Sequence, residues 1–476
     1  MKREFSIAAA WSAAASWLEQ AAAALIFFGI ARIIGVENFG IASMAFAFLF
    51  LGEFLVRDTL TEAIVQRETL EPGRLEATFF VLLGFAFLIT LILIGIAPII
   101  SFVYQEPVAA SLLIAASPAV LLIGISGVST ALLRRRMEYK TLAIRTIVGV
   151  LAGGVVGITM AINDFGAWSL VGQRLTELGI NSTLAILGAK WWPGHWPSRP
   201  EFKLIQGLGP RVVELRALML IVTQSPVVML GVFAEPRAAG IFSFSARLIE
   251  IILKVSVRVI QGVAQSAIAE TRRRNGSTSV FFVELTEISA FAGFLSFGGL
   301  AFISTPLVQV LLGPDWAEAS NVIPFLCISG AAMSLTSLQE AYLMATDQLS
   351  TYLRAIRFEA LLGLAIFVTV GSFGAQAVGA GVALRALFFV PICTRAAIKP
   401  EGISGSEFIS ALRSPALVAL TMIIALWSWR EFATGLLPDW LMLLLSVFLG
   451  ASVAIGLIVL LMPTTYRRLI GYIRAQ

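Results

Sequence analysis

The charged residues that could do chemistry in this chain lie inside apolar segments, most clearly between Gly240 and Gln265. This segment reads GIFSFSARLIEIILKVSVRVIQGVAQ, and its polar side chains follow at steps of three or four residues: Arg247, Glu250, Lys254, Arg258, Gln261 and Gln265. Such spacing places them on one face of a helix. The surplus of positive charge on this face can bind an anion such as a diphosphate, which arginine and lysine suit well. The structural alternative is that Glu250 pairs with its neighbours while Arg258 reaches the cytoplasmic surface.

Other apolar segments carry charges that have the same two interpretations. Glu53 and Arg57 are spaced i and i+4, and an offset of 200 residues carries Arg258 back to Asp58 beside them. We therefore expect two equivalent helices to form the walls of a central cleft. The candidate substrate-binding residues are Arg57, Arg145, Arg174, Arg247, Lys254, Arg258 and Arg385. The candidate coupling or ion-pair carboxylates are Glu19, Glu53 and Glu250.

The elements that must position these residues are membrane-spanning helices. Of the 476 residues, 58% are hydrophobic and only 13% are charged, whereas soluble domains carry about 25% charged residues. A membrane helix needs roughly 20 mainly apolar residues, and backbone groups in lipid must be satisfied within each segment. We predict an all-α polytopic membrane protein with about fourteen spans at 10–34, 40–60, 77–100, 108–133, 141–162, 166–188, 207–231, 239–263, 280–304, 319–345, 353–372, 376–396, 410–428 and 440–462. The first span is too long for a signal peptide and contains Glu19 and Gln20, so we expect it to remain uncleaved.

The loops between these spans differ sharply in charge. Lysine and arginine concentrate in one set of loops, including Arg134–Arg136 and Arg272–Arg274, while the opposite loops hold only Arg237 and Arg430. The positive-inside rule then places both termini in the cytoplasm. The sequence pI near 9.4 follows from this asymmetry and does not indicate nucleic-acid binding.

Short stretches of the chain recur in order. GIASMAFAF at Gly40 resembles GIFSFSARL at Gly240, ISG recurs at Ile125 and Ile328, and FGA recurs at Phe165 and Phe373. The offsets of 200, 203 and 208 residues drift slowly, as expected for two related six-helix halves in the same orientation. We predict lobes at 1–200 and 201–400, followed by two further helices in 401–476. Transporters are often built from such repeats, with the substrate path between them.

The turn GVENFG and two longer stretches, LLRRRMEYKTLAIRTIVGVLAGGVVGI and NDFGAWSLVGQRLTELGINSTLAILGAKWWP, resemble the polysaccharide transporter family. This family of oligosaccharide flippases belongs to the multidrug/oligosaccharidyl-lipid/polysaccharide exporter superfamily. The resemblance implies export of an undecaprenyl-diphosphate-linked oligosaccharide across the bacterial inner membrane, for lipopolysaccharide, capsule or exopolysaccharide synthesis. It also implies alternating access of two lobes, contact with membrane lipids, and a polysaccharide polymerase and co-polymerase as partners.

Several other functions lack their sequence features. The chain has no GxxxxGK[ST] phosphate loop for ATP hydrolysis. A membrane glycosyltransferase or polymerase would need a large periplasmic loop with carboxylates, so we predict that the protein is not an enzyme. The remaining alternative is a cation-coupled multidrug antiporter of the same superfamily, whose cationic substrates would favour a carboxylate-rich cavity.

Cysteine and histidine are too sparse for a disulfide framework or a zinc site. Cys327 and Cys393 fall in apolar segments, where we expect buried free thiols. His195 is the only histidine and lies in the segment WWPGHWP, where we expect an interfacial position. We predict no metal site of the zinc type and no cofactor. Gly153 and Gly157 form a small-xxx-small pair that predicts close packing of helices.

Overall fold

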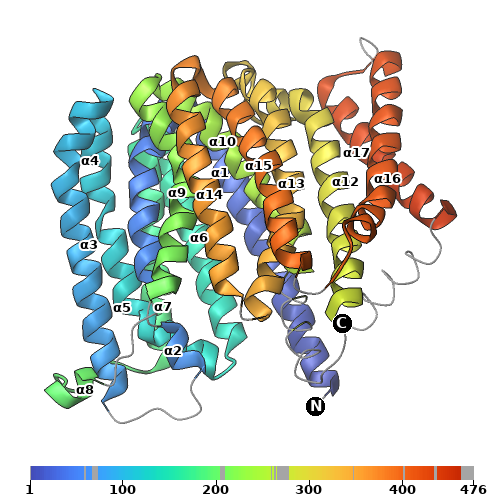
Figure 1. The fold of residues 1–476 in the computed structure, drawn as a ribbon. Coiled ribbons are helices and arrows are strands. Elements are labelled where there is room, and N and C mark those ends of the chain that lie inside the picture. Colours follow the sequence, from blue (N-terminus) through green and yellow to red (C-terminus); the bar gives the residue numbers. More distant parts are fainter. Residues whose placement is uncertain are drawn as a thin grey trace. The chain divides into compact units, whose positions relative to one another are not determined.

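The described part of the chain is helical throughout its regular elements and contains no strand (Figure 1). The computed structural model describes residues 2–57, 61–66, 73–203, 210–258, 260–261, 264, 268, 278–346, 348–399, 402–433 and 437–461. The chain divides into two compact units, Met1–Gly240 and Ile241–Gln476. The lobes predicted at 1–200 and 201–400 were defined by sequence repeats and not by compactness, so their limits stay a prediction.

The first unit begins with a long helical segment and continues with shorter helices. Its helices are α1 (Lys2–Arg57), α2 (Thr61–Gln66), α3 (Arg74–Tyr104), α4 (Pro107–Ala116), α5 (Pro118–Arg135), α6 (Tyr139–Ile162), α7 (Trp168–Ala189), α8 (Arg199–Lys203) and α9 (Pro210–Phe233). The helix α10 (Pro236–Ser256) begins at the end of this unit and lies mostly in the second. The second unit continues with α12 (Thr278–Leu312), η1 (Pro314–Trp316), α13 (Ala319–Ala345), α14 (Leu349–Val370), η2 (Gly371–Phe373), α15 (Gly374–Ile398), α16 (Gly405–Ala433) and α17 (Asp439–Leu461).

The predicted membrane spans coincide with helices wherever the structure describes their residues; parts of the spans 40–60, 207–231, 239–263 and 440–462 lie outside the described residues. In the described part of the chain, ten segments are long and apolar enough to cross a membrane. Two of them, Glu19–Arg57 and Leu349–Ile398, each contain two helical arms separated by a break. The helices α7 and α10 also have the length of a membrane helix, but they contain a larger share of polar and charged residues than the ten segments above. The all-α fold class of a multi-pass membrane protein is therefore confirmed.

The chain reverses direction at Gly35, inside α1. Gly35 has φ 77° and ψ 169°, a conformation that glycine adopts without the steric cost of a Cβ atom. The ring centroids of Phe27 and Phe39 lie 5.5 Å apart, although twelve residues of straight helix would span about 18 Å. The turn predicted at GVENFG is therefore a single residue between two antiparallel arms.

Small residues let the helices of the first unit approach closely. A Cβ atom on Gly153 would lie 2.7 Å from the carbonyl oxygen of Gln173 on α7, and one on Gly157 would lie 2.7 Å from Cδ1 of Ile30 on α1. The close packing predicted from the Gly153–Gly157 spacing is confirmed. Ser182 of α7 adds a hydrogen bond, which its hydroxyl donates to the carbonyl of Leu122 at 2.8 Å.

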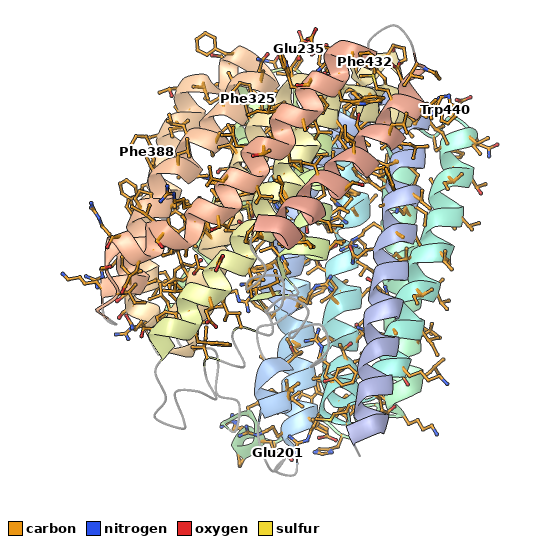
Figure 2. The ribbon with its side chains drawn as sticks, turned by 90° about the vertical axis from the view of Figure 1, so that its right-hand side faces the viewer. Glu201, Glu235, Phe325, Phe388, Phe432 and Trp440 are labelled. Atoms are coloured by element: carbon orange, nitrogen blue, oxygen red, sulfur yellow. The ribbon has the colours of Figure 1, made fainter. Side chains whose placement is uncertain are left out.

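The Trp-rich segment before α8 packs on the start of α3. The ring of Trp196 lies 4.4 Å from that of Phe80, centroid to centroid. His195 is exposed, and its Nε2 lies 3.3 Å from Oε1 of Glu201. The backbone N–H and hydroxyl of Ser198 donate to Glu201 and hold the pKa of its carboxyl below the usual range. Figure 2 shows Glu201 and Glu235 at opposite ends of the first unit.

The core of the second unit forms around α12. Phe291 of α12 packs with Met422 and Leu426 of α16 in a buried cluster. Trp316 is buried against Phe244, with ring centroids 5.1 Å apart. Both cysteines are buried and free, as the sequence predicted.

Candidate functional site

The charged face of α10 is a chain of ion pairs centred on one carboxylate. Nη1 of Arg247 donates to Oε2 of Glu250 at 2.7 Å, and Nζ of Lys254 lies 3.0 Å from Oε1 of the same carboxylate. These three side chains, which we call the α10 stripe, are 31–39% exposed. Two cations share one anion, so the stripe carries a net positive charge. Arg258 follows one turn later, is exposed, and has no ion pair with any described residue.

The first unit contains a second ion-pair network, formed by residues of α1 and α7. Arg174 of α7 contacts both carboxylate oxygens of Glu53, which is only 3% exposed, and its Nη1 lies 3.4 Å from the carboxylate of Glu177. Arg57 joins at the rim, 3.7 Å from Glu53, with its side chain 46% exposed. We call these four residues the α1–α7 network. Its two positive and two negative charges balance.

Two embedded arginines of the first unit, Arg145 and Arg216, form no salt bridge with a carboxylate among the described residues. Nη1 of Arg145 donates to the hydroxyl of Thr130 at 2.8 Å, while its buried Nε has no hydrogen-bond acceptor in the described part of the chain. The charged groups that act on Arg145 electrostatically are Arg134, Arg57 and Glu19. Arg216 of α9 lies over the ring of Phe54, with its guanidinium carbon 5.1 Å from the ring centroid. Cations without a bonded anion are costly in a membrane, so these positions suit an anionic ligand or water.

Arg385 occupies a different environment, between α14 and α15. Its Nε lies 3.4 Å from Oε1 of Glu359, and both side chains are close to fully buried. The guanidinium also lies over Phe367, 5.4 Å from the ring centroid. This geometry is that of a structural ion pair with little surface left for a ligand, so it favours the structural interpretation of Arg385 over the substrate-binding one.

The structure brings together only some of the predicted candidates. In the first unit, Glu53, Arg57 and Arg174 meet across α1 and α7. In the second unit, the α10 stripe forms one group and Arg385 pairs with Glu359. The central cleft between equivalent helices stays a prediction. Sequence reasoning missed Glu359, because its partner is 26 positions further along the chain and on another helix. In contrast, the i, i+3 spacing of Arg174 and Glu177 was visible in the sequence.

No metal-binding constellation is found in the part of the chain that the structure describes. In that part, nowhere do three or more His, Cys, Asp or Glu side chains form a group that could hold a metal ion. His195 has Glu201 as its neighbour, at the surface of the first unit.

Residues 30–321 match the protein family described as "Polysaccharide biosynthesis protein". This range covers 292 residues (321 − 30 + 1), well over half of the 476-residue chain. The chain belongs to this family. The resemblance seen in the sequence is thereby confirmed at the level of the family.

Curated relatives are similar over nearly the whole chain. The succinoglycan biosynthesis transport protein ExoT of Rhizobium meliloti is 23% identical over 460 residues, which cover 94% of this chain and 91% of that protein. The lipopolysaccharide biosynthesis protein WzxC of Escherichia coli is 21% identical and covers 89% of this chain and 87% of its own length.

Solved structures establish the fold. The inward closed conformation of the lipid II flippase MurJ superposes with a TM-score of 0.76 at 14% identity, and covers 97% of this chain and 99% of that one. An inward-facing multidrug transporter of the MATE family superposes with a TM-score of 0.62 at 13% identity, over 80% of this chain and 94% of that one. At these identities the similarity shows the shared fold alone.

Proposed function

We propose that this protein is a flippase that exports an undecaprenyl-diphosphate-linked oligosaccharide across the bacterial inner membrane. The product would supply the synthesis of lipopolysaccharide, capsule or exopolysaccharide. Membership of the polysaccharide biosynthesis family supports this proposal, as do relatives that are named as succinoglycan and lipopolysaccharide biosynthesis proteins. Transport by alternating access is part of the same proposal.

The main support for the proposal is an excess of positive charge: several arginine and lysine side chains are not neutralised by a described carboxylate. The α1–α7 network is neutral, whereas Arg145 and Arg216 form no salt bridge with a described carboxylate: Arg145 donates to the hydroxyl of Thr130, and Arg216 lies over the ring of Phe54. In the second unit, the α10 stripe has two cations for one carboxylate, and Arg258 adds a third cation. Arginine and lysine bind phosphates through strong charge-assisted hydrogen bonds. An anionic lipid carrier therefore suits these residues better than a cationic drug.

The multidrug alternative needs embedded carboxylates that can receive a cation. Glu53 contacts Arg174, Glu250 contacts Arg247 and Lys254, and Glu359 contacts Arg385. Each of these three carboxylates already has its charge compensated inside its own unit. This arrangement disfavours a cation-coupled drug antiporter. It also weakens the coupling role considered for Glu53 and Glu250.

Both termini are proposed to lie in the cytoplasm, since the basic loops of the sequence follow the positive-inside rule. A polysaccharide polymerase and co-polymerase are the proposed functional partners, because a flipped oligosaccharide has to be joined into polymer on the far side of the membrane.

Deletion of the gene separates the two transport functions. We expect the deletion strain to accumulate lipid-linked oligosaccharide on the cytoplasmic face and to lose a surface polysaccharide, with both defects reversed by the wild-type gene. The oligosaccharide can be located by periodate or lectin accessibility in right-side-out and inverted vesicles. Normal polymer in a strain that becomes sensitive to cationic drugs would instead establish the multidrug function.

A further inference from the structure

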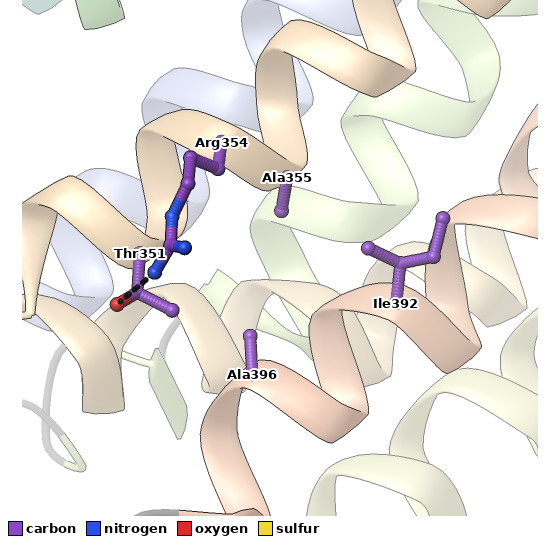
Figure 3. Close-up of a pocket in the computed structure, with 5 residues that line it drawn as sticks. All are labelled: Thr351, Arg354, Ala355, Ile392 and Ala396. Atoms are coloured by element: carbon purple, nitrogen blue, oxygen red, sulfur yellow. Dashed lines mark hydrogen bonds between the residues drawn. The ribbon is translucent and has the colours of Figure 1, made fainter.

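A small open groove lies between the first turns of α14 and the last turns of α15. Its volume is about 210 Å³, and it is lined by Thr351, Arg354 and Ala355 of α14 and by Ile392 and Ala396 of α15 (Figure 3). Three of these lining residues, Ala355, Ile392 and Ala396, are apolar. One side carries the guanidinium of Arg354, which donates a 3.4 Å hydrogen bond to the hydroxyl of Thr351.

Positive charge gathers at this end of the groove, and no described carboxylate forms a salt bridge with Arg354, which is exposed. Arg395 and Lys399, also exposed, lie one residue before and three residues after Ala396. The last turn of α15 therefore adds two cations close to the groove. An anionic group is the complementary occupant of this end.

The other end of the groove continues into exposed apolar surface. Phe388 and Leu384 extend the row of Ala396 and Ile392 at intervals of four residues, so they lie on the same face of α15. They are 53% and 47% exposed, and Figure 2 shows Phe388 at the outer edge of the second unit. On α14, Phe358 follows Arg354 at the same interval and is 43% exposed. The groove therefore has cationic side chains at one end, and exposed apolar side chains continue from its other end along α14 and α15.

We propose that this groove, defined by Thr351, Arg354, Ala355, Ile392 and Ala396, binds an anionic membrane phospholipid. Its phosphate would accept hydrogen bonds from Arg354, and its acyl chains would lie along Leu384, Phe388 and Phe358. The occupant is a bulk lipid of the membrane and not the exported substrate, because none of the groove residues belongs to the α10 stripe or the α1–α7 network. The inference therefore does not rest on the proposed function.

A phospholipid fits the observations better than a free anion does. A free phosphate would use the cationic end alone, whereas the apolar residues that continue the rows of Arg354 and Ile392 suit acyl chains. The groove is open and not an enclosed cavity, so a lipid can enter it.

Native mass spectrometry of the purified full-length protein tests the proposal, with phosphatidylglycerol and phosphatidylcholine as the added lipids. We expect wild-type protein to retain one tightly bound phosphatidylglycerol more than phosphatidylcholine. Arg354→Gln should weaken this adduct roughly ten- to hundredfold, the range for the loss of one hydrogen bond to a charged group. Ala396→Phe should weaken it as well, because the new ring fills the groove while every charge is kept.

Arg413→Gln is the matched control, since Arg413 is another exposed arginine of the second unit, on α16, without an ion pair to a described residue. It should leave the adduct unchanged. Equal retention of the two lipids, or equal losses in Arg354→Gln and Arg413→Gln, would overturn the proposal. Displacement of the lipid by millimolar inorganic phosphate would overturn it in favour of a free-anion site. The readout does not involve export, so it stands or fails independently of the transport function.

Discussion

Gly40 and Gly240 meet where the second arm of α1 crosses the start of α10. A Cβ atom on Gly240 would lie 3.0 Å from the backbone nitrogen of Gly40, and one on Gly40 would lie 3.1 Å from the backbone nitrogen of Gly240. The first Cβ would also collide with the carbonyl of Val36, and the second with the carbonyl of Pro236. Val36 and Pro236 are 200 positions apart, as are Gly40 and Gly240, so this offset converts the Gly240–Val36 contact into the Pro236–Gly40 contact. Such an exchange is what the predicted repeat of the two halves would give.

This crossing predicts that neither glycine tolerates a side chain. Gly40→Ala or Gly240→Ala should destabilise the protein by about 1–3 kcal/mol, the usual cost of overpacking, because a backbone carbonyl cannot move aside as a side chain can. Thermal unfolding in detergent, followed by size-exclusion chromatography, measures the effect. Gly84→Ala in α3 is the control: nothing lies within 4 Å of its Cβ position, and alanine is the better helix former. Equal stability of all three variants would contradict the crossing.

The α1–α7 network predicts an asymmetry between its two arginines. Arg174→Ala leaves the buried carboxylate of Glu53 without its main partner, so we expect a loss of about 3–5 kcal/mol and low abundance in the membrane. Arg57→Ala removes an exposed partner at 3.7 Å and should cost at most about 1 kcal/mol. Adding Glu53→Gln to Arg174→Ala should restore much of the abundance. Quantitative immunoblotting of membranes separates these outcomes, and equal effects of the two arginine variants would disprove the asymmetry.

If Arg385 and Glu359 form only a structural ion pair, replacing both with uncharged residues at the same time should leave export intact. Replacing a buried ion pair by apolar residues of similar volume is often neutral or stabilising. We therefore expect Arg385→Met with Glu359→Leu to retain export, while Arg385→Met alone loses abundance because Glu359 is left buried and unpaired. Complementation of a deletion strain, scored as polymer per amount of protein, gives the readout. Loss of export at normal abundance in the double variant would return Arg385 to the substrate-binding residues.

Arg258 offers a cleaner test of anion binding than Lys254. Lys254→Ala leaves Glu250 with Arg247 at 2.7 Å, so it does not leave the carboxylate unpaired. Arg258→Ala disturbs no described ion pair and should impair export at unchanged abundance, by roughly ten- to hundredfold if one charge-assisted bond is lost. Arg258→Lys should retain a larger part of the activity. Full export by Arg258→Ala would remove this residue from the site.

The ends of the first unit predict opposite labelling of two positions. In a background that lacks Cys327 and Cys393, Glu235→Cys should react with a membrane-impermeant maleimide added to intact spheroplasts. Arg199→Cys, in the segment with Glu201 at the other end of the unit, should react only after lysis. Both residues are exposed, so access and not burial decides the result. The reverse pattern would invert the proposed topology.

Hydrophobic patterning predicted the helices well because each membrane helix must satisfy its own backbone and is long enough to be recognised alone. The arms around Gly35 and the i, i+4 pairs of α10 depend only on nearby residues, and they were predictable for that reason. The partners of Arg385 and Arg145 were not, because Glu359 and Thr130 lie on other helices, and one sequence does not reveal which faces meet. Several embedded charges could therefore be read from the sequence, whereas Glu359 and the division of the charges into balanced networks and unbalanced cations are visible only in the folded protein.

The single-residue turn at Gly35 has a consequence for biogenesis. No loop connects the two arms of α1, so no stretch of chain can remain in water between them while only the first arm is inserted. The two arms are therefore expected to enter the membrane together. They are expected to leave the translocon as one preformed hairpin, with Phe27 and Phe39 already in contact. The same turn provides no connecting segment that could be lengthened, so an epitope or protease site inserted at Gly35 would separate the two arms and should not be tolerated.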